Sequence, residues 1–266
     1  MNATSRPDWV HRAERVLGPI GEPQPLSGSA WRARAGAIPI VVKTGPGVAD
    51  EAAGLVALAG VAGCPPVPEV LLAEDEVLVT SWVDQVHRTD AHLQAIRRAL
   101  AALHSAPRAV WGGGSSWIGS CRVDASEATT GSEFYGRRLA ELAGRCGLAE
   151  EVGPVVSRLD ELLDDAGPVL VHGDPWWGNI LWGADGRGWL IDPSRHGGHP
   201  EEDLAMLDLF GSVPAPLMRS YNEVRPCQEG WQLRRPLFSL YPLLVHTVLF
   251  GGSYRSQAIA AAGFYR

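Results

Sequence analysis

One segment of the chain, residues 168–193 with the sequence PVLVHGDPWWGNILWGADGRGWLIDP, constrains the fold more than any other. It contains two short strand-like segments, 179–182 and 189–191, which are mostly apolar and are separated by the pair Asp185-Gly186. An Asp-Gly pair between two apolar runs is a strong signal for a tight β-hairpin turn. A further apolar run, 169–171, leads into the loop before this hairpin. The sequence therefore predicts a small β insertion in a chain that is otherwise mainly helical on either side of it.

The predicted hairpin gathers polar side chains at one of its ends. Asn179 stands at the entrance of the first strand and Asp192 at the exit of the second, so both come to the same end, beside Asp174 in the preceding loop. Two carboxylates and a carboxamide are hard oxygen ligands of the kind that Mg²⁺ takes together with substrate phosphates. Apolar residues flank each of them, which favours a cleft over an exposed surface.

Each of these residues also has an ordinary structural interpretation. Asp174 is compatible with a turn, Asn179 with a turn or cap, and Asp192 with the position before Pro193. The joint spacing and strand context favour function for these three. For His172 we favour the structural role, because a histidine two residues before the reactive acid is well placed to bond the backbone and shape the loop.

The basic residues are distributed unevenly between types, with 22 arginines and a single lysine, Lys43. Lys43 ends the β-branched run 38–43, behind a small-residue turn, and Glu51 follows eight residues later on a predicted helix. In kinases a strand lysine is held over nucleotide phosphates by an ion pair with a helix glutamate. Lys43 and Glu51 are candidates for that pair, although a solvated helix position is the alternative for Glu51.

Periodicity divides the chain into a small lobe, residues 1–83, and a larger helical lobe, residues 84–266. The small lobe is predicted to hold helices at 9–17 and 49–60 and strands at 26–35, 38–43, 70–73 and 77–82. The large lobe is predicted to hold a helix at 90–103, several helices over 133–165, and further helices at 201–210, 236–250 and 253–264, with an irregular segment at 106–131. Pro242 is expected to kink or break the helix at 236–250. The fold class is α+β, with an antiparallel sheet in the small lobe.

Composition excludes some classes of partner. The net charge is −7 and the pI about 5.6, which gives no general attraction to nucleic acid or to an anionic membrane. We find no signal peptide and no membrane span, and the four cysteines form no C-x-x-C pair. We therefore expect a cytoplasmic protein with reduced thiols and no structural metal, and the sequence leaves its oligomeric state open.

The loop and hairpin also carry a family resemblance. The residues HGD at 172–174 with Asn179, and IDP at 191–193, resemble the aminoglycoside-phosphotransferase and choline-kinase group of small-molecule kinases. The runs GHPEEDLAMLDLFG (198–211), GWQLRRPLFSLYPLLVH (230–246) and LFGGSY (249–254) are similar to the fructosamine kinase, or ketosamine-3-kinase, family. This resemblance implies a two-lobed protein-kinase-like fold, ATP and Mg²⁺ as cofactors, and phosphorylation of the 3-hydroxyl of ribulosamine or fructosamine adducts, which makes the adduct labile.

The resemblance also implies a role for each matching residue. Asp174 is implied as the catalytic aspartate, Asn179 and Asp192 as the Mg²⁺ ligands, and Lys43 with Glu51 as the phosphate-binding pair. The interlobe hinge, whose backbone meets adenine, corresponds to Ser81, Trp82 and Val83. Asp203 lies at a predicted helix start, from which its carboxylate could brace the catalytic loop; a surface cap is the alternative.

The acceptor side departs from the family pattern. Pro175 and Trp177 alter the usual catalytic loop, Arg195-His196 replaces a Tyr-Tyr pair, and Val245 replaces an asparagine. Flat apolar side chains suit sugar rings, and the candidates for lining the acceptor pocket are Trp176, Trp177, Trp231 and His246; core packing is the alternative for the tryptophans. The substrate is expected to be a small-molecule or protein-bound ketosamine.

Three other functions are alternatives to this one. The first is an aminoglycoside- or choline-type phosphotransferase with a different hydroxyl acceptor. The second is a metal-dependent hydrolase that uses His172, Asp174, His196 and His199, which would leave Lys43 and the hairpin without a role. The third is a non-catalytic nucleotide-binding module. Such a module would lack at least one of the catalytic residues, whereas this sequence contains all of them.

Overall fold

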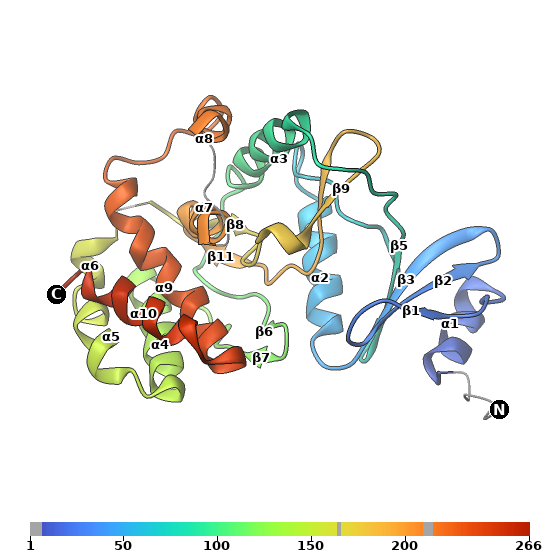
Figure 1. The fold of residues 1–266 in the computed structure, drawn as a ribbon, viewed down its shortest axis with the longest axis horizontal. Coiled ribbons are helices and arrows are strands. Elements are labelled where there is room, and N and C mark those ends of the chain that lie inside the picture. Colours follow the sequence, from blue (N-terminus) through green and yellow to red (C-terminus); the bar gives the residue numbers. More distant parts are fainter. Residues whose placement is uncertain (1–6, 164–165, 210–214) are drawn as a thin grey trace.

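The computed structural model describes residues 7–163, 166–209 and 215–266. They form two lobes, a sheet-containing N-terminal lobe and a larger helical C-terminal lobe (Figure 1). The sheet is antiparallel with strand order β1-β2-β3-β5-β4. Its strands are β1 (Gln24–Pro25), β2 (Ala30–Ala35), β3 (Ile38–Thr44), β4 (Val70–Glu74) and β5 (Val77–Ser81). The predicted α+β class and two-lobed architecture are confirmed.

The N-terminal sheet is covered on both faces by helices. Alternate residues of a strand point to opposite faces, so Ile40, Val42 and Val79 pack against α1 (Trp9–Leu17). Leu78 faces the other way and packs against α2 (Val48–Ala59). Lys43 follows Val42 in the same strand and therefore lies on the α2 side of the sheet, which is the side that carries Glu51.

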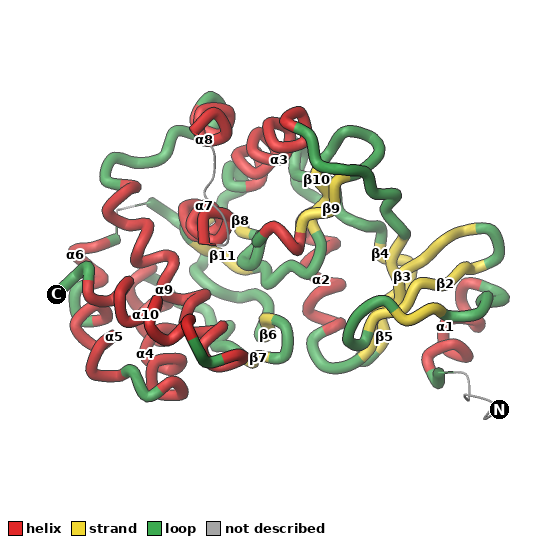
Figure 2. The backbone as a smooth tube through the Cα atoms, viewed as in Figure 1, coloured by secondary structure: helices red, strands yellow, loops and turns green. Residues whose placement is uncertain are grey.

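The C-terminal lobe is built around α9 (Trp231–Phe250), which packs against α4 (Gly131–Cys146), α7 (Pro200–Leu209) and α10 (Ser253–Gly263). Its other helices are α3 (Asp90–Leu103), α5 (Ala149–Val156), α6 (Leu159–Leu162) and α8 (Ala215–Asn222). Figure 2 shows that helix dominates this lobe and that strand is sparse in it.

The strands of the C-terminal lobe form three two-stranded sheets among the described residues. They are β6 (Trp117–Ile118) with β7 (Cys121–Arg122), β8 (Val169–Val171) with β11 (His196–Gly198), and β9 (Ile180–Trp182) with β10 (Gly188–Leu190). The β9–β10 pair is the predicted hairpin, with Gly183–Gly186 in its turn. The sequence did not predict β11, whose pairing with β8 fixes the chain that follows Asp192.

Several element boundaries differ from the predicted ones. The strand expected from Leu26 begins at Ala30, because the backbone hydrogen bonds of Leu26 and Ala30 close a tight turn instead. The helices expected over 133–165 are α4, α5 and α6, and α4 is ended by Gly147 in the left-handed conformation (φ 62°). Positions 164–165 and 210 of the predicted helices lie outside the described residues.

Pro242, which was expected to kink or break its helix, does not break it. Helix α9 continues through both Pro236 and Pro242. Each proline removes one backbone hydrogen bond, but one face of α9 is buried in the main core by Leu237, Leu240 and Leu244, and this packing holds the helix together. Within the part of the chain that the structure describes, no helix is long and apolar enough to cross a membrane.

Candidate active site

A cavity of about 710 Å³ lies between the two lobes. Its lining includes all five of the polar residues that the sequence singled out for phosphoryl transfer, which are Lys43, Glu51, Asp174, Asn179 and Asp192. Three of them come from the catalytic loop and hairpin and two from the N-terminal lobe. A cavity of this size is within the usual range for small-molecule sites.

The catalytic loop holds Asp174 against Asn179. The Asn179 side-chain amide donates to the Asp174 backbone carbonyl (2.9 Å) and to its carboxylate oxygen Oδ2 (3.0 Å). The other oxygen, Oδ1, is buried and makes no hydrogen bond within the described chain. Burial, reinforced by the negative charge of Asp192, raises the pKa of Asp174 well above its ordinary value. The structure therefore presents a basic carboxylate to the cavity.

Asp192 reaches the site through the register of the hairpin. Leu190 pairs with Ile180, and the Ile191 N–H donates to the Asn179 carbonyl, so Asn179 and Asp192 share one end as predicted. Asp192 is the one non-glycine among the described residues with positive φ (55°). This left-handed conformation is tolerated by aspartate but strained, and such positions cluster at functional sites.

Lys43 links the two lobes through the carboxylates that flank it. Its ammonium donates to Glu51 Oε1 (2.7 Å) on α2 and to Asp192 Oδ1 after the hairpin. Burial lowers the pKa of Lys43, but the charges of Asp192 and Glu51 outweigh burial, so the pKa is raised. For Glu51, burial dominates and raises the pKa to about 7 in spite of Lys43. The predicted lysine–glutamate pair is thus present.

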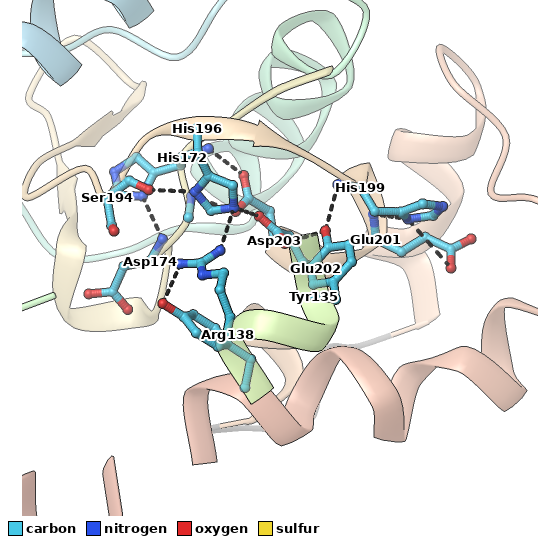
Figure 3. A network of polar contacts seen from close by, with 12 residues as sticks. Tyr135, Arg138, His172, Asp174, Ser194, His196, His199, Glu201, Glu202 and Asp203 are labelled. Carbon is cyan, nitrogen blue, oxygen red and sulfur yellow. Dashed lines mark hydrogen bonds and ion pairs between the residues drawn. The ribbon is translucent and has the colours of Figure 1, made fainter. Parts of the chain in front are cut away.

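Asp203 braces the catalytic loop from the first turn of α7 (Figure 3). Its carboxylate accepts hydrogen bonds from the backbone N–H groups of His172 (2.8 Å) and Gly173 (2.9 Å), and from His104 Nε2 (3.0 Å). The Tyr221 hydroxyl lies 2.8 Å from His104 Nδ1. Burial raises the pKa of Asp203, but these donors outweigh it, so the pKa is lowered. The bracing role is confirmed, and the surface-cap alternative is wrong.

His172 has the structural role that its position suggested. Its Nε2 lies 3.1 Å from the Ile191 carbonyl oxygen, and its Nδ1 accepts from the Asp174 backbone N–H at 3.3 Å. Burial lowers the pKa of His172, which favours the neutral ring that this pattern requires. The ring therefore ties the catalytic loop to the second strand of the hairpin.

A second network, also drawn in Figure 3, fixes β11 behind the catalytic loop. Arg138 Nη1 lies 3.0 Å from His196 Nε2, which lies 2.6 Å from Glu202 Oε1. The Tyr135 hydroxyl donates to Glu202 Oε2 (2.6 Å) and accepts from the His199 backbone N–H (2.8 Å). His196 and His199 thus serve packing, and no three histidine, cysteine or carboxylate side chains gather as a metal-ligand set within the described residues. The structure gives no support to the hydrolase alternative.

The hinge segment begins at Ser81, the last residue of β5, and its residues do not line the 710 Å³ cavity. The Ser81 N–H donates to the Glu69 carbonyl and the Trp82 N–H to the Pro39 carbonyl. The Arg32 guanidinium stacks 4.3 Å over the Trp82 ring. Val83 is buried. Contact between Ser81, Trp82, Val83 and an adenine ring stays a prediction.

The four candidate acceptor residues separate into two pairs. Trp176 and His246 line the cavity together with Asp174. Trp177 and Trp231 do not: Trp177 packs against the main core beside Trp182, and Trp231 is buried at the start of α9. Trp177 and Trp231 therefore pack in the core, which was the alternative interpretation, because the elements that carry them turn their rings inward.

Sequence reasoning missed other residues of the cavity wall. The segment 115–120, which was expected to be irregular, contributes Ser115, Trp117 and Ser120. Asp50 accepts from the Ser116 backbone N–H (2.9 Å) and hydroxyl (2.8 Å), which ties α2 to this segment. Leu249, Phe250 and Tyr254, which belong to the LFGGSY run, also line the cavity. That run was a family signal, but nothing in it indicated proximity to Asp174.

Comparison with known proteins assigns the family. The sequence model described as fructosamine kinase matches residues 46–262. The chain belongs to the fructosamine kinase family. A curated relative from Synechocystis sp., named a probable ketoamine kinase, is 34% identical over 68% of this chain and 64% of its own length. The chloroplastic protein-ribulosamine 3-kinase of Oryza sativa subsp. indica is 31% identical over 64% of this chain and 54% of its own length. The chain thus matches somewhat less than two thirds of each of these relatives.

Solved structures agree with this assignment. A Thermobifida fusca protein, named as a proposed fructosamine-3-kinase, has a TM-score of 0.87 at 34% identity, with 97% of this chain and 98% of that chain covered. The aminoglycoside phosphotransferase APH(4)-Ia, solved with ADP and hygromycin B, has a TM-score of 0.61 at 20% identity over 96% of both chains. The second likeness shows the fold alone, and it confirms the predicted phosphotransferase-like architecture.

Proposed function

We propose that this protein is an ATP-dependent ketosamine kinase that transfers the γ-phosphoryl group to the 3-hydroxyl of a ribulosamine or fructosamine adduct. The observation that carries the proposal is the convergence of Asp174, Asn179, Asp192 and the Lys43–Glu51 pair on one interlobe cavity. Membership of the fructosamine kinase family supports the reaction class, and the names of the relatives support the acceptor.

The residues present fit ATP and Mg²⁺. The cavity offers oxygen donors suited to Mg²⁺, because Asn179 uses its amide nitrogen on Asp174 and keeps its carbonyl oxygen as the remaining polar atom of the side chain. The Asp192 carboxylate lies at the same end of the hairpin. When bound, the metal would neutralise charge on the phosphates. We propose Asn179 and Asp192 as its ligands, and residues 1–83 as the lobe that holds the nucleotide.

The protein's own groups then position the reactants and move one proton. Lys43 places a positive charge where phosphates would lie, and Glu51 with Asp192 keeps that ammonium in place. Asp174 orients the attacking hydroxyl and accepts its proton, for which its raised pKa suits it. Asp203 and His172 hold the loop so that the Asp174 carboxylate keeps its position. Little covalent chemistry is required, so positioning and charge carry the catalysis.

The test is ATP turnover with Mg²⁺ against four acceptors: ribulosyl-lysine, fructosyl-lysine, choline and an aminoglycoside. Product mass is recorded for each. Addition of one phosphate to a ketosamine, with no addition to the other two, is the expected result. Transfer to the aminoglycoside or choline instead would support the alternative phosphotransferase. Hydrolysis of ATP without transfer to any acceptor, with nucleotide binding intact, would overturn the assigned acceptor class.

A further inference from the structure

Helix α2 is tied to the C-terminal lobe at its first turn. Asp50, in that turn, accepts two hydrogen bonds at Oδ2, from the Ser116 backbone N–H (2.9 Å) and from the Ser116 hydroxyl (2.8 Å). A Cβ on Gly47, the residue before α2, would lie 3.0 Å from Cγ of Trp117, so the start of the helix also packs on the next residue of that segment. In Figure 1, α2 lies at the boundary between the two lobes. We call the Asp50–Ser116 contact the interlobe latch.

The segment that carries Ser116 is itself fixed to the chain that follows the hairpin. The Ser115 N–H donates to the Arg195 carbonyl (2.8 Å), and an Arg195 side-chain N–H donates to the Gly113 carbonyl (3.2 Å). A Cβ at Gly114 would overlap the Arg195 carbonyl oxygen, so only glycine allows the two segments to approach this closely. Ser116 therefore presents its two donors from a well-anchored part of the C-terminal lobe.

The latch lies one residue from the side chain that holds the phosphate-binding lysine. Asp50 and Glu51 are neighbours on α2, so the position of one along and around the helix axis fixes the position of the other. Glu51 Oε1 accepts from the Lys43 ammonium at 2.7 Å. A shift of about 1 Å in this part of α2 is enough to lengthen that contact beyond hydrogen-bonding distance. The latch can thus act on Lys43 through Glu51.

The other carboxylate that holds Lys43 has a second proposed task. Asp192 accepts from the ammonium in the free protein and is also a proposed Mg²⁺ ligand. A bound divalent cation is the largest local charge in such a site and would compete with the ammonium for this carboxylate. Two contacts of α2 with the C-terminal lobe use none of these groups, the latch and the packing of Gly54 on Pro193. Of the two, the latch is the directional one, and its charged acceptor makes its hydrogen bonds strong.

We propose that Asp50 is a positioning residue for phosphoryl transfer, which by binding Ser116 keeps α2 where Glu51 meets Lys43. The inference rests on the proposed kinase function. Asp50 lines the interlobe cavity, but Ser116 does not: it lines a separate surface hollow of about 620 Å³. An effect of Ser116 on the use of ATP is therefore indirect, and the latch gives its route.

The kinetic experiment measures initial rates at varied ATP for Ser116→Ala, Asp50→Ala and the double variant. Ser116→Ala loses one of the two hydrogen bonds and should lower kcat/KM for ATP by about three- to tenfold. Asp50→Ala loses both and should lower it by about ten- to a hundredfold, the effect of misplaced reacting groups. The double variant should be no worse than Asp50→Ala alone, because the latch is already absent. KM for the acceptor should stay constant throughout.

The conservative variant and the control separate position from charge and from helix stability. Asp50→Asn keeps a side-chain oxygen that can accept from both donors, so it should stay within about threefold of the wild type. Asp90→Ala removes an exposed carboxylate from the first turn of α3, outside the cavity lining. It tests the general effect of losing a negative charge at a helix start, and it should leave kcat/KM for ATP unchanged.

Hydrogen exchange reports on the latch without activity. In protein free of nucleotide, the amides of α2 should exchange at least about threefold faster in Ser116→Ala and Asp50→Ala than in the wild type, with those of α3 unchanged. Unchanged exchange of α2 in Asp50→Ala, or an active Ser116→Ala with the wild-type kcat/KM for ATP, would overturn the proposal. Losses that add in the double variant would overturn it too, since Asp50 would then act by its own charge in the cavity.

Failure of the kinase function gives a different result. Absence of phosphoryl transfer by the wild-type protein would overturn the kinase function and the positioning role together. Faster exchange of α2 in the two alanine variants would then show that the latch holds the helix all the same, which distinguishes this failure from the failure of the latch.

Discussion

Two buried carboxylates beside the same loop have pKa values displaced in opposite directions, and their hydrogen-bond donors explain why. Asp203 accepts from two backbone N–H groups and a histidine, so the pKa falls in spite of complete burial. Asp174 accepts from one amide only and faces Asp192, so burial prevails and the pKa rises. A carboxylate with a raised pKa can take a proton, and one with a lowered pKa serves as a fixed brace.

Replacing Asp174 tests the base. Asp174→Asn keeps the shape of the side chain but cannot accept the proton of the attacking hydroxyl, so kcat should fall by at least about a hundredfold. Initial-rate kinetics with a ketosamine acceptor measure this, with circular dichroism to check the fold. Asp185→Asn, in the exposed hairpin turn, is the control. A variant within tenfold of the wild type would remove Asp174 from the role of base.

Replacing Asp203 tests whether its carboxylate stabilises the loop at His172 and Gly173. Asp203→Asn puts an amide against the donors from His104, His172 and Gly173, and should lower the free energy of unfolding at pH 7 by about 3 kcal/mol. The folded-state pKa of Asp203 lies below the ordinary 3.8. The carboxylate therefore stabilises the fold fully above that value, and this stabilisation is lost as pH falls through the folded pKa.

Urea unfolding of the two proteins across a pH series gives the comparison. The difference between wild type and Asp203→Asn should be constant from pH 7 down to about pH 4 and should narrow only below that. A difference that is independent of pH down to pH 2 would show that the charge of Asp203 does not contribute.

At the scale of elements, the position of α2 decides whether the ion pair can form. Gly54 lies on α2 three residues after Glu51, and a Cβ placed there would come within 2.7 Å of Pro193 Cγ. Glycine thus lets the helix rest directly on the chain that follows Asp192. Because Glu51 and Asp192 both hold Lys43, this contact sets the geometry of the phosphate-binding end of the site.

Gly54→Ala tests this contact. The added methyl group should push α2 away from Pro193 and lower kcat/KM for ATP by about ten- to a hundredfold, the usual effect of misplacing reacting groups by about 1 Å. Alanine is the better helix former, so a general loss of helix stability would not explain the result. The control is Gly153→Ala in α5, where the added Cβ meets nothing within 4 Å. Equal activity of the two variants would contradict the role of the contact.

At the scale of the whole molecule, arginine supplies all the basic side chains except one, since the sequence has 22 arginines and a single lysine. That lysine, Lys43, lies at the junction of the two lobes. Arg138 and Arg234 serve as rigid buried anchors in the C-terminal lobe, where planar hydrogen-bonding geometry is useful. Lys43 instead offers a compact point charge to the cavity. The molecule thus has one side-chain amine, and it belongs to the site.

Amine labelling with an N-hydroxysuccinimide ester at pH 8 follows from this. The raised pKa of Lys43 keeps its amine protonated, so modification in the folded protein should be at least about tenfold slower than in urea, since only the free amine reacts. Peptide mass spectrometry reports the modified position. Asp192→Asn removes one of the two carboxylates that raise the pKa and should speed labelling of the folded protein. Equal rates in folded and unfolded protein would contradict the buried ion pair.

Sequence reasoning succeeded where the determining interactions are local. The Asp185-Gly186 turn sets the register of the hairpin, and that register places Asn179 opposite Ile191 and beside Asp192. Lys43 and Glu51 are only eight residues apart, on a strand and the helix that follows it, and the kinase arrangement of a strand lysine with a helix glutamate predicted their ion pair.

The sequence alone did not predict contacts between elements that are far apart in the chain. Whether a tryptophan lines the cavity or enters the core depends on how distant elements cross, which explains why Trp176 lines it while Trp177 and Trp231 do not. The continuity of α9 through two prolines was decided by burial against α4 and α7, which outweighs two lost hydrogen bonds. For the same reason Phe250 and Tyr254 could not be assigned to the site in advance.

The sequence by itself therefore determined the family, the two-lobed α+β fold and the polar groups suited to phosphoryl transfer, because short-range register and turn chemistry position them. Only the tertiary structure decided the direction in which the pKa values of those groups are displaced and which residues surround them. Burial raised the pKa of Asp174, donors from distant segments lowered that of Asp203, and the path of α9 brought Leu249 and Phe250 to the wall of the cavity. Desolvation and long-range contacts are properties of the assembled chain, so no local pattern records them.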